Sequence, residues 1–395
     1  MKKIIFFIIK KINFLSRWLS YYDMYKYLNH HKWIWKIFKV RILKLTFLNS
    51  LEDEKDVVLL KDIQTEYIRD IKNLDKSLIS NLWNDDILKF SKKKISDLFL
   101  NTTPEILSKI MNEIFRTNYV YGLSSGSAFE YQNSFLGKRM WSLKYYDLIV
   151  SLCEYFSLVR HESFSQGDFG YYLNKNIDEL IKKIETHCGI NIGFPNIGSP
   201  YGISVDNNLI TFENLEHLYA SERIWEFIGL FYTNKNRRIN IIEIGGGYGG
   251  LARNMILKNS DLIESYSLVD LPLMISYQKY FLNKSFRDSN IINKFRFFSV
   301  EEFFKQDSKF DIIINQNSFA EMSIKIVDKY AKKFLNSDNG SLLISLNHEA
   351  ISKYHEEMQV SVPDVIKNLK EFKKILRSLS WVRKGYVEEV YKIQC

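Results

Sequence analysis

Hydrophobic positions change their spacing about halfway along the chain. Residues 51–190 place apolar side chains three and four positions apart, as in the segments 56–74 (DVVLLKDIQTEYIRDIKNL) and 104–120 (PEILSKIMNEIFRTNYV). This spacing is typical of amphipathic helices. Thr103 and Pro104 predict a helix start, with Thr103 as N-cap and Pro104 in the first turn. We therefore expect this part of the chain to be mainly helical.

From about residue 206 onward, short apolar runs alternate with segments of helical spacing. Helices are expected at 213–232, 251–259, 272–283, 319–335 and 364–379. Strands are expected in the run ending at Glu243 and at 265–270, 295–300, 310–316 and 340–348. This alternation predicts an α/β fold with a doubly wound, mostly parallel, Rossmann-like sheet. Two last strands, 381–387 and 388–394, are too close together for a crossover and predict an antiparallel C-terminal hairpin that makes seven strands.

The chain length favours more than one domain. We place a boundary just after the loop 193–202 (GFPNIGSPYG), because Gly and Pro gather there. This gives a basic, aromatic segment at 1–50, a mainly helical substrate-recognition domain at 51–205 and a cofactor-binding domain at 206–395. A second run rich in Gly and Ser, 122–141, is expected to be a loop near a pocket.

The segment 241–250 (IIEIGGGYGG) is the most informative part of the chain. It predicts a buried strand, a tight glycine turn and a helix N-terminus. Glycines allow the backbone to approach a ligand closely, because no Cβ is in the way. Gly245, Gly247 and Gly250 match G-x-G-x-x-G, the fingerprint of dinucleotide sites, and Asp270 follows 20 residues after the last of them. By spacing alone, the turn would bind NAD.

Glu243 argues for a different cofactor. A carboxylate next to the glycine turn would repel a pyrophosphate, whereas it would attract a cation. S-adenosylmethionine carries a sulfonium and an ammonium group and no phosphate, so it suits this turn better. Asp270, at the end of the next strand, would then bind the ribose hydroxyls of the cofactor. The alternative is a structural turn in which the acid is satisfied by hydrogen bonds.

Three segments together resemble the sugar O-methyltransferase family, which has a class I S-adenosylmethionine-dependent methyltransferase domain. They are 243–255 (EIGGGYGGLARNM), 266–282 (YSLVDLPLMISYQKYFL) and 310–322 (FDIIINQNSFAEM), and the stretch 198–224 is similar to the same family. The resemblance covers roughly residues 190–350. It implies methyl transfer from S-adenosylmethionine to a sugar hydroxyl of a surface polysaccharide or its precursor, and it implies a glycan or activated sugar as acceptor.

The carboxyl ends of the predicted strands supply further candidates, since ligands of open α/β sheets bind there. Ser299 ends the third strand and is expected at the adenine edge. Asn315 and Ser318 follow the fourth strand and are expected to face the cofactor and the acceptor.

Methyl transfer to an alcohol needs a base to remove the hydroxyl proton. His348, at the end of the fifth strand, is one candidate because its ordinary pKa lies near neutral pH; it could also be a plain surface residue. Glu321 is the second candidate. Its alternative is structural, because Ser318-x-x-Glu321 matches a capping box at a helix start.

Tyr219 and Arg223 lie four positions apart on the helix before the first strand and therefore share a face. Arg223 is expected to bind the carboxylate of the cofactor and Tyr219 to contact the acceptor, although Arg223 could equally be an ordinary surface residue. Tyr201, which follows Pro200, could line the acceptor pocket or pack in a core. No spacing of His, Cys or acids predicts a metal site.

The net charge of +9 is unevenly distributed. Residues 1–50 contain 11 Lys and Arg and one acid, whereas residues 51–395 contain 44 Lys and Arg and 45 acids. The uninterrupted apolar run 4–9 is shorter than the core of about 7–15 residues in a signal peptide and the about 20 residues of a membrane span. The basic, aromatic segment fits peripheral contact with an anionic membrane. A nucleic-acid arm, or a basic helix packed on the domain, would have a similar composition.

The three cysteines, Cys153, Cys188 and Cys395, are widely spaced and odd in number, which predicts free thiols in a reducing cytoplasm. We expect the protein in the cytoplasm, at the inner face of the membrane if residues 1–50 bind it, and without a nucleic-acid partner. Two other functions remain open. One is an NAD-dependent sugar oxidoreductase, and the other is a non-catalytic scaffold with a methyltransferase-like fold.

Overall fold

The computed structural model describes residues 26–27, 36, 38–50, 53–79, 86–120, 122–124, 134–163, 165–206, 208–233, 237–349, 353–354 and 357–394. Most of the predicted basic segment, including residues 1–25, lies outside the described residues.

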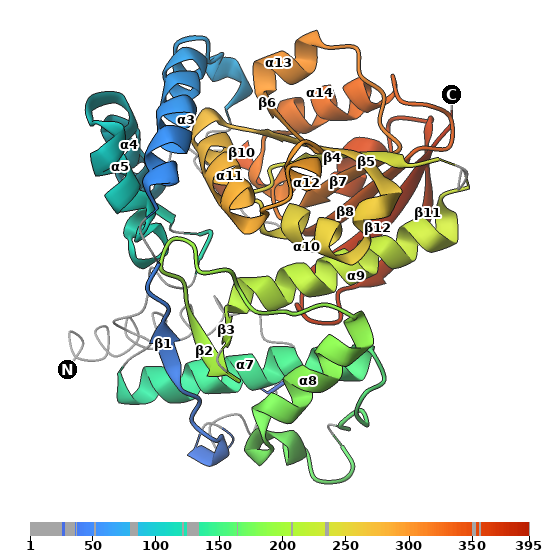
Figure 1. Ribbon diagram of the computed structural model, residues 1–395. Coiled ribbons are helices and arrows are strands. Elements are labelled where there is room, and N and C mark those ends of the chain that lie inside the picture. The colour runs from blue at the N-terminus through green and yellow to red at the C-terminus, as the bar shows by residue number, and fades with distance from the viewer. Residues whose placement is uncertain are drawn as a thin grey trace, which may run out of the picture.

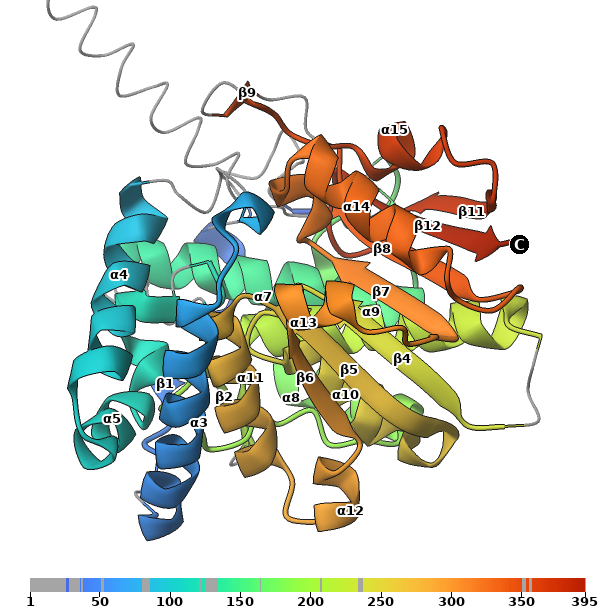
Figure 2. The ribbon, with the colours of Figure 1, turned by 90° about the horizontal axis from the view of Figure 1, so that it is seen from above.

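A seven-stranded sheet forms the centre of the C-terminal half (Figures 1 and 2). Its strands are β4 (Ile239–Ile244), β5 (Ile263–Asp270), β6 (Phe295–Ser299), β7 (Ile312–Gln316), β8 (Leu342–His348), β11 (Phe372–Leu379) and β12 (Tyr386–Ile393). They are ordered β11-β12-β8-β7-β4-β5-β6. β4 to β8 are parallel to one another, and β12 runs antiparallel to both β8 and β11. The predicted α/β fold with a mostly parallel seven-stranded sheet is confirmed.

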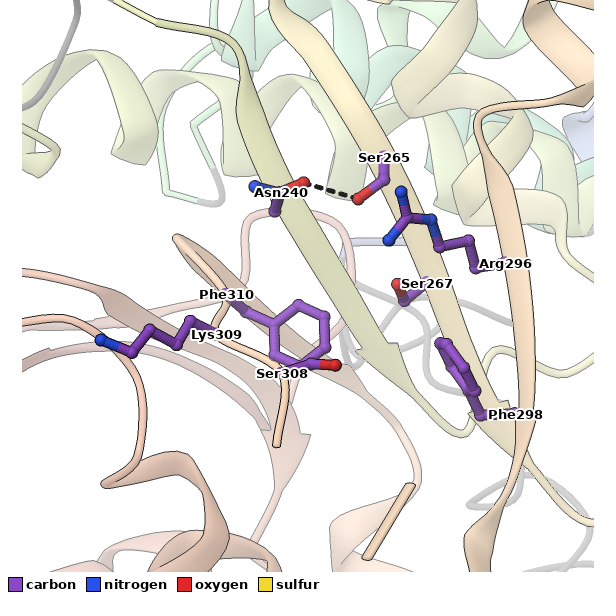
Figure 3. Close-up of a pocket in the computed structure, with 8 residues that line it drawn as sticks. All are labelled: Asn240, Ser265, Ser267, Arg296, Phe298, Ser308, Lys309 and Phe310. Atoms are coloured by element: carbon purple, nitrogen blue, oxygen red, sulfur yellow. Dashed lines mark hydrogen bonds between the residues drawn. The ribbon is translucent and has the colours of Figure 1, made fainter. Parts of the chain in front are cut away.

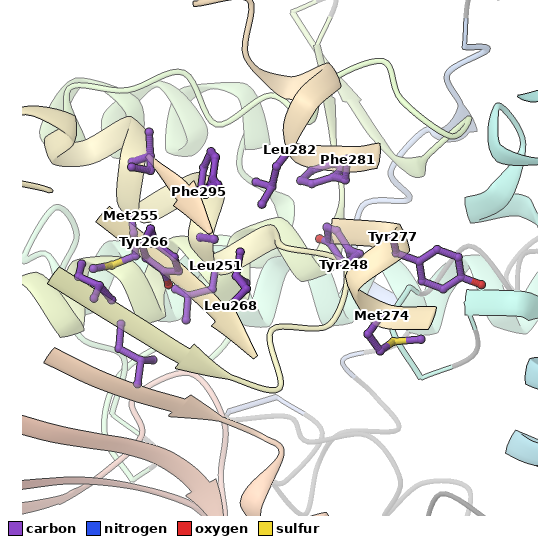
Figure 4. Packing of buried hydrophobic residues seen from close by; sticks show 14 of the residues in the cluster. Tyr248, Leu251, Met255, Tyr266, Leu268, Met274, Tyr277, Phe281, Leu282 and Phe295 are labelled. Carbon is purple, nitrogen blue, oxygen red and sulfur yellow. The ribbon is translucent and has the colours of Figure 1, made fainter. Parts of the chain in front are cut away.

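Helices cover both faces of this sheet, which explains why its strands are nearly continuous apolar runs. One face carries α9 (Phe212–Phe231), α10 (Gly250–Asn259) and α11 (Pro272–Ser285), whose apolar side chains pack on alternate strand residues such as Ile241 and Leu268 (Figure 4). The other carries α13 (Val300–Lys305), α14 (Ile324–Phe334) and α15 (Val362–Ile366), which pack on Ile242 and Val269. Adjacent strand residues point to opposite faces, so one strand serves both cores.

The N-terminal half packs against this sheet domain in two places. α3 (Glu54–Lys72), α4 (Asp86–Asn101) and α5 (Pro104–Met111) lie beside α11, and their apolar residues join its core cluster (Figure 2). α7 (Phe135–Tyr155) and α8 (Ile177–Cys188) pack with α9 in a separate cluster. This second cluster also includes a small sheet of β1 (Leu45–Phe47), β2 (Tyr201–Val205) and β3 (Asn208–Ile210).

Several short elements complete the fold. They are the 3₁₀ turns η1 (Lys76–Leu78), η3 (Ile114–Arg116), η4 (Asn118–Val120), η6 (Tyr171–Asn174), η7 (Ser260–Leu262) and η8 (Phe319–Glu321), the helix α12 (Ser289–Ile292) and the strand pair β9 (Lys353–Tyr354) and β10 (Glu357–Met358). Cys153 and Cys188 are buried free thiols, and Cys395 lies outside the described residues. Within the described ranges, no helix combines the length and the apolar character that a bilayer crossing requires.

The predicted helix at 364–379 is wrong. Only Val362–Ile366 is helical, and Phe372–Leu379 is the edge strand β11. Its apolar residues are spaced like those of a helix because the pairing of β11 with β12 shifts between Lys374 and Leu376, as at a β-bulge. The last two strands are therefore misplaced in the prediction: β11 comes earlier, and β12 spans residues 386–393.

Two other boundaries also differ from the prediction. The run 122–141 is not a loop throughout, because α7 starts at Phe135, where the Ser134 hydroxyl accepts a hydrogen bond from the Gly137 N–H at 3.0 Å. The helix expected at 319–335 is interrupted, since η8 ends at Glu321 before α14 begins at Ile324.

Part of the basic segment is built into the fold. Lys26 is completely buried, and its ammonium group pairs with Glu154 of α7. The Lys26 N–H also donates to Asp147 at 2.9 Å. Farther along the segment, β1 pairs with β2. Lys26 is therefore part of the core, and β1 is held in the small sheet, whereas residues such as Lys39 and Lys44 of the same segment are exposed.

We expect Lys26→Met to destabilise the protein strongly, because it leaves the buried Glu154 carboxylate without its ammonium partner. Removing one partner of a buried ion pair typically costs about 3–5 kcal/mol of unfolding free energy. Urea denaturation of the variant measures this loss. Lys39→Met, at an exposed position of the same segment, is the control and should change stability by less than about 0.5 kcal/mol. Equal stabilities of the two variants would show that the pair is not structural.

Candidate functional site

The glycine turn between β4 and α10 has the left-handed backbone conformation that its composition predicts. Gly245, Gly247 and Gly249 have φ values of +75°, +58° and +95°. A Cβ at residue 245 would also overlap the side chain of Ser318. The Gly245 N–H donates to the Val269 carbonyl of β5 at 2.9 Å, which fixes the turn at the carboxyl edge of the sheet. Glycine at 245 is thus required by both conformation and space.

Glu243 lies beneath this turn. It is only 2% exposed, and its carboxylate accepts a hydrogen bond from the Tyr266 hydroxyl at 2.8 Å. A Cβ at Gly246 would lie 3.3 Å from the Glu243 carboxyl carbon, so the acid supports the turn from below. Burial raises the pKa of Glu243 to about 7, the nearby charge of Asp270 adds to the shift, and the Tyr266 bond opposes it.

Asp270 ends β5 beside the same turn. Its carboxylate accepts hydrogen bonds from the Leu271 N–H at 2.8 Å and from the Gln278 side-chain amide at 2.9 Å. Burial raises the pKa of Asp270 to about 7, whereas its hydrogen bonds and the charge of Lys92 act in the opposite direction. Two buried carboxyl groups therefore adjoin one glycine turn, and both titrate near neutral pH.

Gln278 of α11 is a site residue that the sequence pattern did not indicate. Its amide nitrogen donates to Asp270 and, at 3.1 Å, to the Gly247 carbonyl, so it ties the acid to the turn. Its buried Oε1 has no hydrogen-bond partner among the described residues. The only signal in the sequence is a glutamine in an otherwise apolar helix face, two turns after Asp270.

A network of amides braces the turn from β7 and β8. The Asn315 amide and the Ser318 hydroxyl both donate to the Ile244 carbonyl, at 3.0 and 2.9 Å. The Asn347 amide donates to Asn315 Oδ1 at 2.9 Å. Asn315 and Ser318 are thus at the predicted edge. Their contact with a ligand remains a prediction, because these bonds already give both side chains a structural role.

Glu321 does not form the capping box that we considered as its alternative. η8 has no side-chain cap bond at Ser318, whose hydroxyl bonds to Ile244 instead. Glu321 is half-buried, and burial raises its pKa, while the charges of Lys92 and Arg383 lower it. Glu321 therefore follows β7 closely and does not have the cap contact considered for it.

Lys92 is a further site residue that sequence reasoning missed. It comes from α4, in the N-terminal half, and is half-buried. Burial lowers the pKa of Lys92 to about 8, against the opposing charges of Glu321 and Asp270. Its charge thus interacts with both acids at the sheet edge. The sequence does not show that Lys92 lies near them, because it is one of three consecutive lysines far from both in the chain.

A capping box does occur at Ser299, the residue expected at the adenine edge. The Ser299 hydroxyl accepts from the Glu302 N–H, and the Glu302 carboxylate accepts from the Ser299 N–H, at 3.2 and 2.9 Å. This box starts α13. The hydroxyl is therefore used locally, and contact with adenine remains a prediction.

His348 ends β8 as predicted, and it is half-buried. Its ring lies edge-on to Tyr386, with 5.6 Å between ring centroids. Tyr386 in turn accepts a hydrogen bond from Arg383 at 2.7 Å. The turn between β11 and β12 thus brings an arginine to the same edge as the predicted base.

His217 of α9 also lies at the glycine turn and was not identified from the sequence. A Cβ at Gly250 would overlap its ring, and its Nδ1 lies 3.4 Å from the Tyr248 hydroxyl. Burial, with a smaller effect from Arg383, lowers the pKa of His217 to about 4, so the ring is neutral at physiological pH.

Tyr219 and Arg223 do share one face of α9, but both bond to the buried Glu388 of β12. Tyr219 donates to one carboxylate oxygen, and Arg223 Nε donates to the other at 2.7 Å. Arg223 also pairs with Glu226 at 2.7 Å. The two residues fasten α9 to the sheet, and their predicted contacts with cofactor and acceptor stay predictions.

Tyr201 is buried in the small sheet and packs on Phe47, with 4.7 Å between ring centroids. Burial raises its pKa to about 12. These contacts agree with its packing alternative, and a role in the acceptor pocket remains untested.

A polar cavity of about 210 Å³ lies elsewhere on the sheet (Figure 3). Its walls include Asn240 of β4, Ser265 of β5 and Arg296 of β6, all near the amino ends of their strands. The glycine turn is at the carboxyl ends, where ligands of such sheets bind. This cavity is therefore not the predicted cofactor site. Within the described ranges, no three His, Cys, Asp or Glu side chains are grouped to hold a metal ion.

No family model and no curated protein matches this chain. Among solved structures, an O-methyltransferase family protein from Burkholderia thailandensis is similar at 10% identity and a TM-score of 0.34, over 46% of this chain and 59% of that one. Human N-acetylserotonin methyltransferase, in complex with S-adenosylmethionine, is similar at 13% identity and a TM-score of 0.31, over 46% and 56%.

Magnesium protoporphyrin IX methyltransferase from Synechocystis PCC 6803 gives 10% identity and a TM-score of 0.34, over 46% of this chain and 82% of that one. This chain spans less than two thirds of the length of the Burkholderia thailandensis protein and of the human enzyme. Similarity at this level carries no argument about reaction or substrate. The fold rests on the strand order and the mostly parallel sheet, which are consistent with a Rossmann-like methyltransferase fold.

The raised pKa of Glu243 predicts how stability depends on pH. The protonated acid is favoured in the folded state, so its contribution is fully present below the unfolded pKa of about 4.5 and is lost as the pH rises through about 7. Glu243→Gln keeps an acceptor for Tyr266 but cannot ionise. We expect it to raise the unfolding free energy by about 3 kcal/mol near pH 8 and by less than about 1 kcal/mol near pH 5.

Thermal unfolding at the two pH values measures this difference. Glu264→Gln, at an exposed position near the start of β5, is the matched control and should behave like the unchanged protein at both. If Glu243→Gln gave the same shift at both pH values, Glu243 would not titrate near neutrality.

Proposed function

We propose that this chain is an S-adenosylmethionine-dependent O-methyltransferase that acts on a sugar hydroxyl of a surface polysaccharide or its precursor. The choice of S-adenosylmethionine as cofactor is supported by two buried carboxyl groups, those of Glu243 and Asp270, at one glycine turn. The sugar is supported by the resemblance of three sequence segments, 243–255, 266–282 and 310–322, to sugar O-methyltransferases.

The turn has the chemistry that such a cofactor requires. A cation beside the two acids favours their ionised forms, whereas a pyrophosphate would be repelled by them. Among the described residues, a Cβ at Gly247 would meet only the Leu123 side chain, at 3.4 Å. The Gln278 Oε1 is a buried acceptor next to the turn without a hydrogen-bond partner in the described part of the chain, and a ligand donor could satisfy it.

We assign the cofactor to the turn through Gly245 and Gly247 and to Asp270, whose carboxylate can accept from the ribose hydroxyls. When bound, S-adenosylmethionine supplies a methyl group already activated by the positive sulphur. Ser299 and Asn315 flank this position at the ends of β6 and β7.

Arg223 was expected to bind the carboxylate of the cofactor. It is left out of this assignment, because its guanidinium group already binds Glu388 and Glu226.

The chain must also remove the proton of the attacking hydroxyl. We propose Glu321 for this step, because it is half-buried at the sheet edge, its pKa is raised, and it adjoins the segment 315–318 that braces the turn. Lys92 is a nearby cation whose charge offsets part of the effect of burial on the pKa of Glu321, and it can stabilise negative charge on an acceptor. His348, at the end of β8, is the alternative base.

The same two acids also argue against the alternative of a redox reaction. An NAD-dependent oxidoreductase would have to place a pyrophosphate against two buried carboxyl groups, which is unfavourable. A scaffold without turnover would bind the cofactor but would not depend on Glu321 or His348.

The unfolding temperature measured with each ligand distinguishes S-adenosylmethionine from NAD as the cofactor. We expect S-adenosylmethionine and S-adenosylhomocysteine to raise the unfolding temperature, because a ligand that binds only the folded state stabilises it, by about 2.7 kcal/mol at a concentration of 100 times Kd. NAD and NADH should give no shift. A shift with NAD alone would favour the oxidoreductase.

Mass spectrometry of surface glycans from cells with and without the gene would then identify the acceptor by the loss of one methylene mass.

Two variants test the base. With labelled S-adenosylmethionine and a glycan extract, Glu321→Gln should lower the transfer rate by about 10²-fold or more while leaving cofactor affinity unchanged. His348→Ala should lower it only slightly. The activity of the unchanged protein should fall at acid pH, as Glu321 becomes protonated. A large loss in His348→Ala and none in Glu321→Gln would transfer the role to His348, and Glu264→Gln serves as the control.

A further inference from the structure

Exposed apolar side chains gather on two segments of the N-terminal half. Phe38 and Ile42, just before β1, are 58% and 45% exposed, and Phe135 and Leu136, in the first turn of α7, are 73% and 46% exposed. Other strongly exposed apolar residues, such as Leu230, Leu262 and Ile324, come from three separate elements. Exposure of large apolar side chains to water costs free energy, so a group of them on one surface often marks an interaction site.

The two segments lie side by side. The guanidinium group of Arg139 lies 5.3 Å from the centre of the Phe135 ring, and it donates to the Phe38 carbonyl at 3.3 Å. Farther along, the Leu43 N–H donates to the Ser142 hydroxyl at 2.9 Å. Residues 38–43 therefore follow the first two turns of α7, and the four apolar side chains belong to one surface.

The charges that these two segments carry have a single sign, and the nearby acid Asp178 comes from α8. Lys39, Arg41, Lys44 and Lys138 are all exposed. No acid occurs at residues 36–50 or 134–146. The small sheet and α7 lie on the side of α9 that is away from the seven-stranded sheet, so this surface is remote from the sheet core (Figure 1). We name the eight residues the basic–apolar face: Phe38, Lys39, Arg41, Ile42, Lys44, Phe135, Leu136 and Lys138.

We propose that the basic–apolar face docks on an anionic lipid bilayer. Basic side chains beside exposed aromatic and aliphatic ones match the two parts of a bilayer surface, since Lys and Arg pair with anionic headgroups and the apolar side chains enter the boundary with the acyl chains. The phosphates of a nucleic acid would pair with the basic side chains, but a nucleic acid would not provide an apolar environment for Ile42 and Leu136. This inference does not depend on the reaction proposed above.

Vesicle co-sedimentation of the full chain tests the proposal. We expect binding to vesicles of phosphatidylcholine and phosphatidylglycerol in equal parts, weakening with salt, and little binding to phosphatidylcholine alone. Lys39→Gln/Lys44→Gln should lower the partition constant about fivefold for each charge removed. Phe135→Ser/Leu136→Ser should lower it about tenfold or more.

Leu230→Ser/Leu262→Ser removes equally exposed apolar residues elsewhere and should bind as the unchanged protein does. Thermal unfolding of each variant confirms that it is folded, and the two test variants change different chemistry, so failure of one to fold leaves the other decisive. The proposal is overturned if the chain ignores anionic vesicles or binds a single-stranded oligonucleotide in their place. It is also overturned if both test variants bind as well as the control.

Discussion

Burial of two carboxyl groups at one glycine turn is the constraint on which the account of the site depends. Glu243 supports the turn from below and Asp270 flanks it, and burial raises the pKa of both to about 7. Each ionised acid lacks the solvation that water would provide, so burial disfavours the charged forms near neutral pH. The cationic ligand proposed for the turn would offset that cost. The proposal therefore predicts that ligand binding and carboxyl ionisation are coupled.

The N-terminal half takes part in this site as well as in the fold. α4 contributes Lys92, which acts electrostatically on Asp270 and Glu321. Leu123, in the stretch that follows η4, is the nearest neighbour of a Cβ at Gly247. The Tyr277 hydroxyl of α11 donates to the Tyr119 carbonyl of η4 at 3.4 Å. Changes in the helical half should therefore alter chemistry at the sheet edge, even though the cofactor is assigned to the other half.

Local patterns in the sequence were enough for the sheet and the glycine turn, because strands buried on both faces and a turn that needs positive φ leave unambiguous residue types. They failed at β11, where a bulge gives an edge strand the apolar spacing of a helix. They also missed Gln278, His217 and Lys92. Each reaches the turn through tertiary packing, and nothing in its immediate neighbourhood marks it. The shared helix face of Tyr219 and Arg223 was predicted correctly, but the sequence could not show that this face bonds to Glu388 of β12.

Proton release on cofactor binding tests the coupling most directly. Titration calorimetry near pH 7, in buffers of different ionisation enthalpy, measures it. The account predicts that S-adenosylmethionine releases protons from Glu243 and Asp270, because a bound cation lowers the pKa of both carboxyl groups. S-adenosylhomocysteine, without the sulfonium charge, should release fewer. Proton uptake, or equal release by the two ligands, would contradict the claim that the turn is built for a positively charged sulphur.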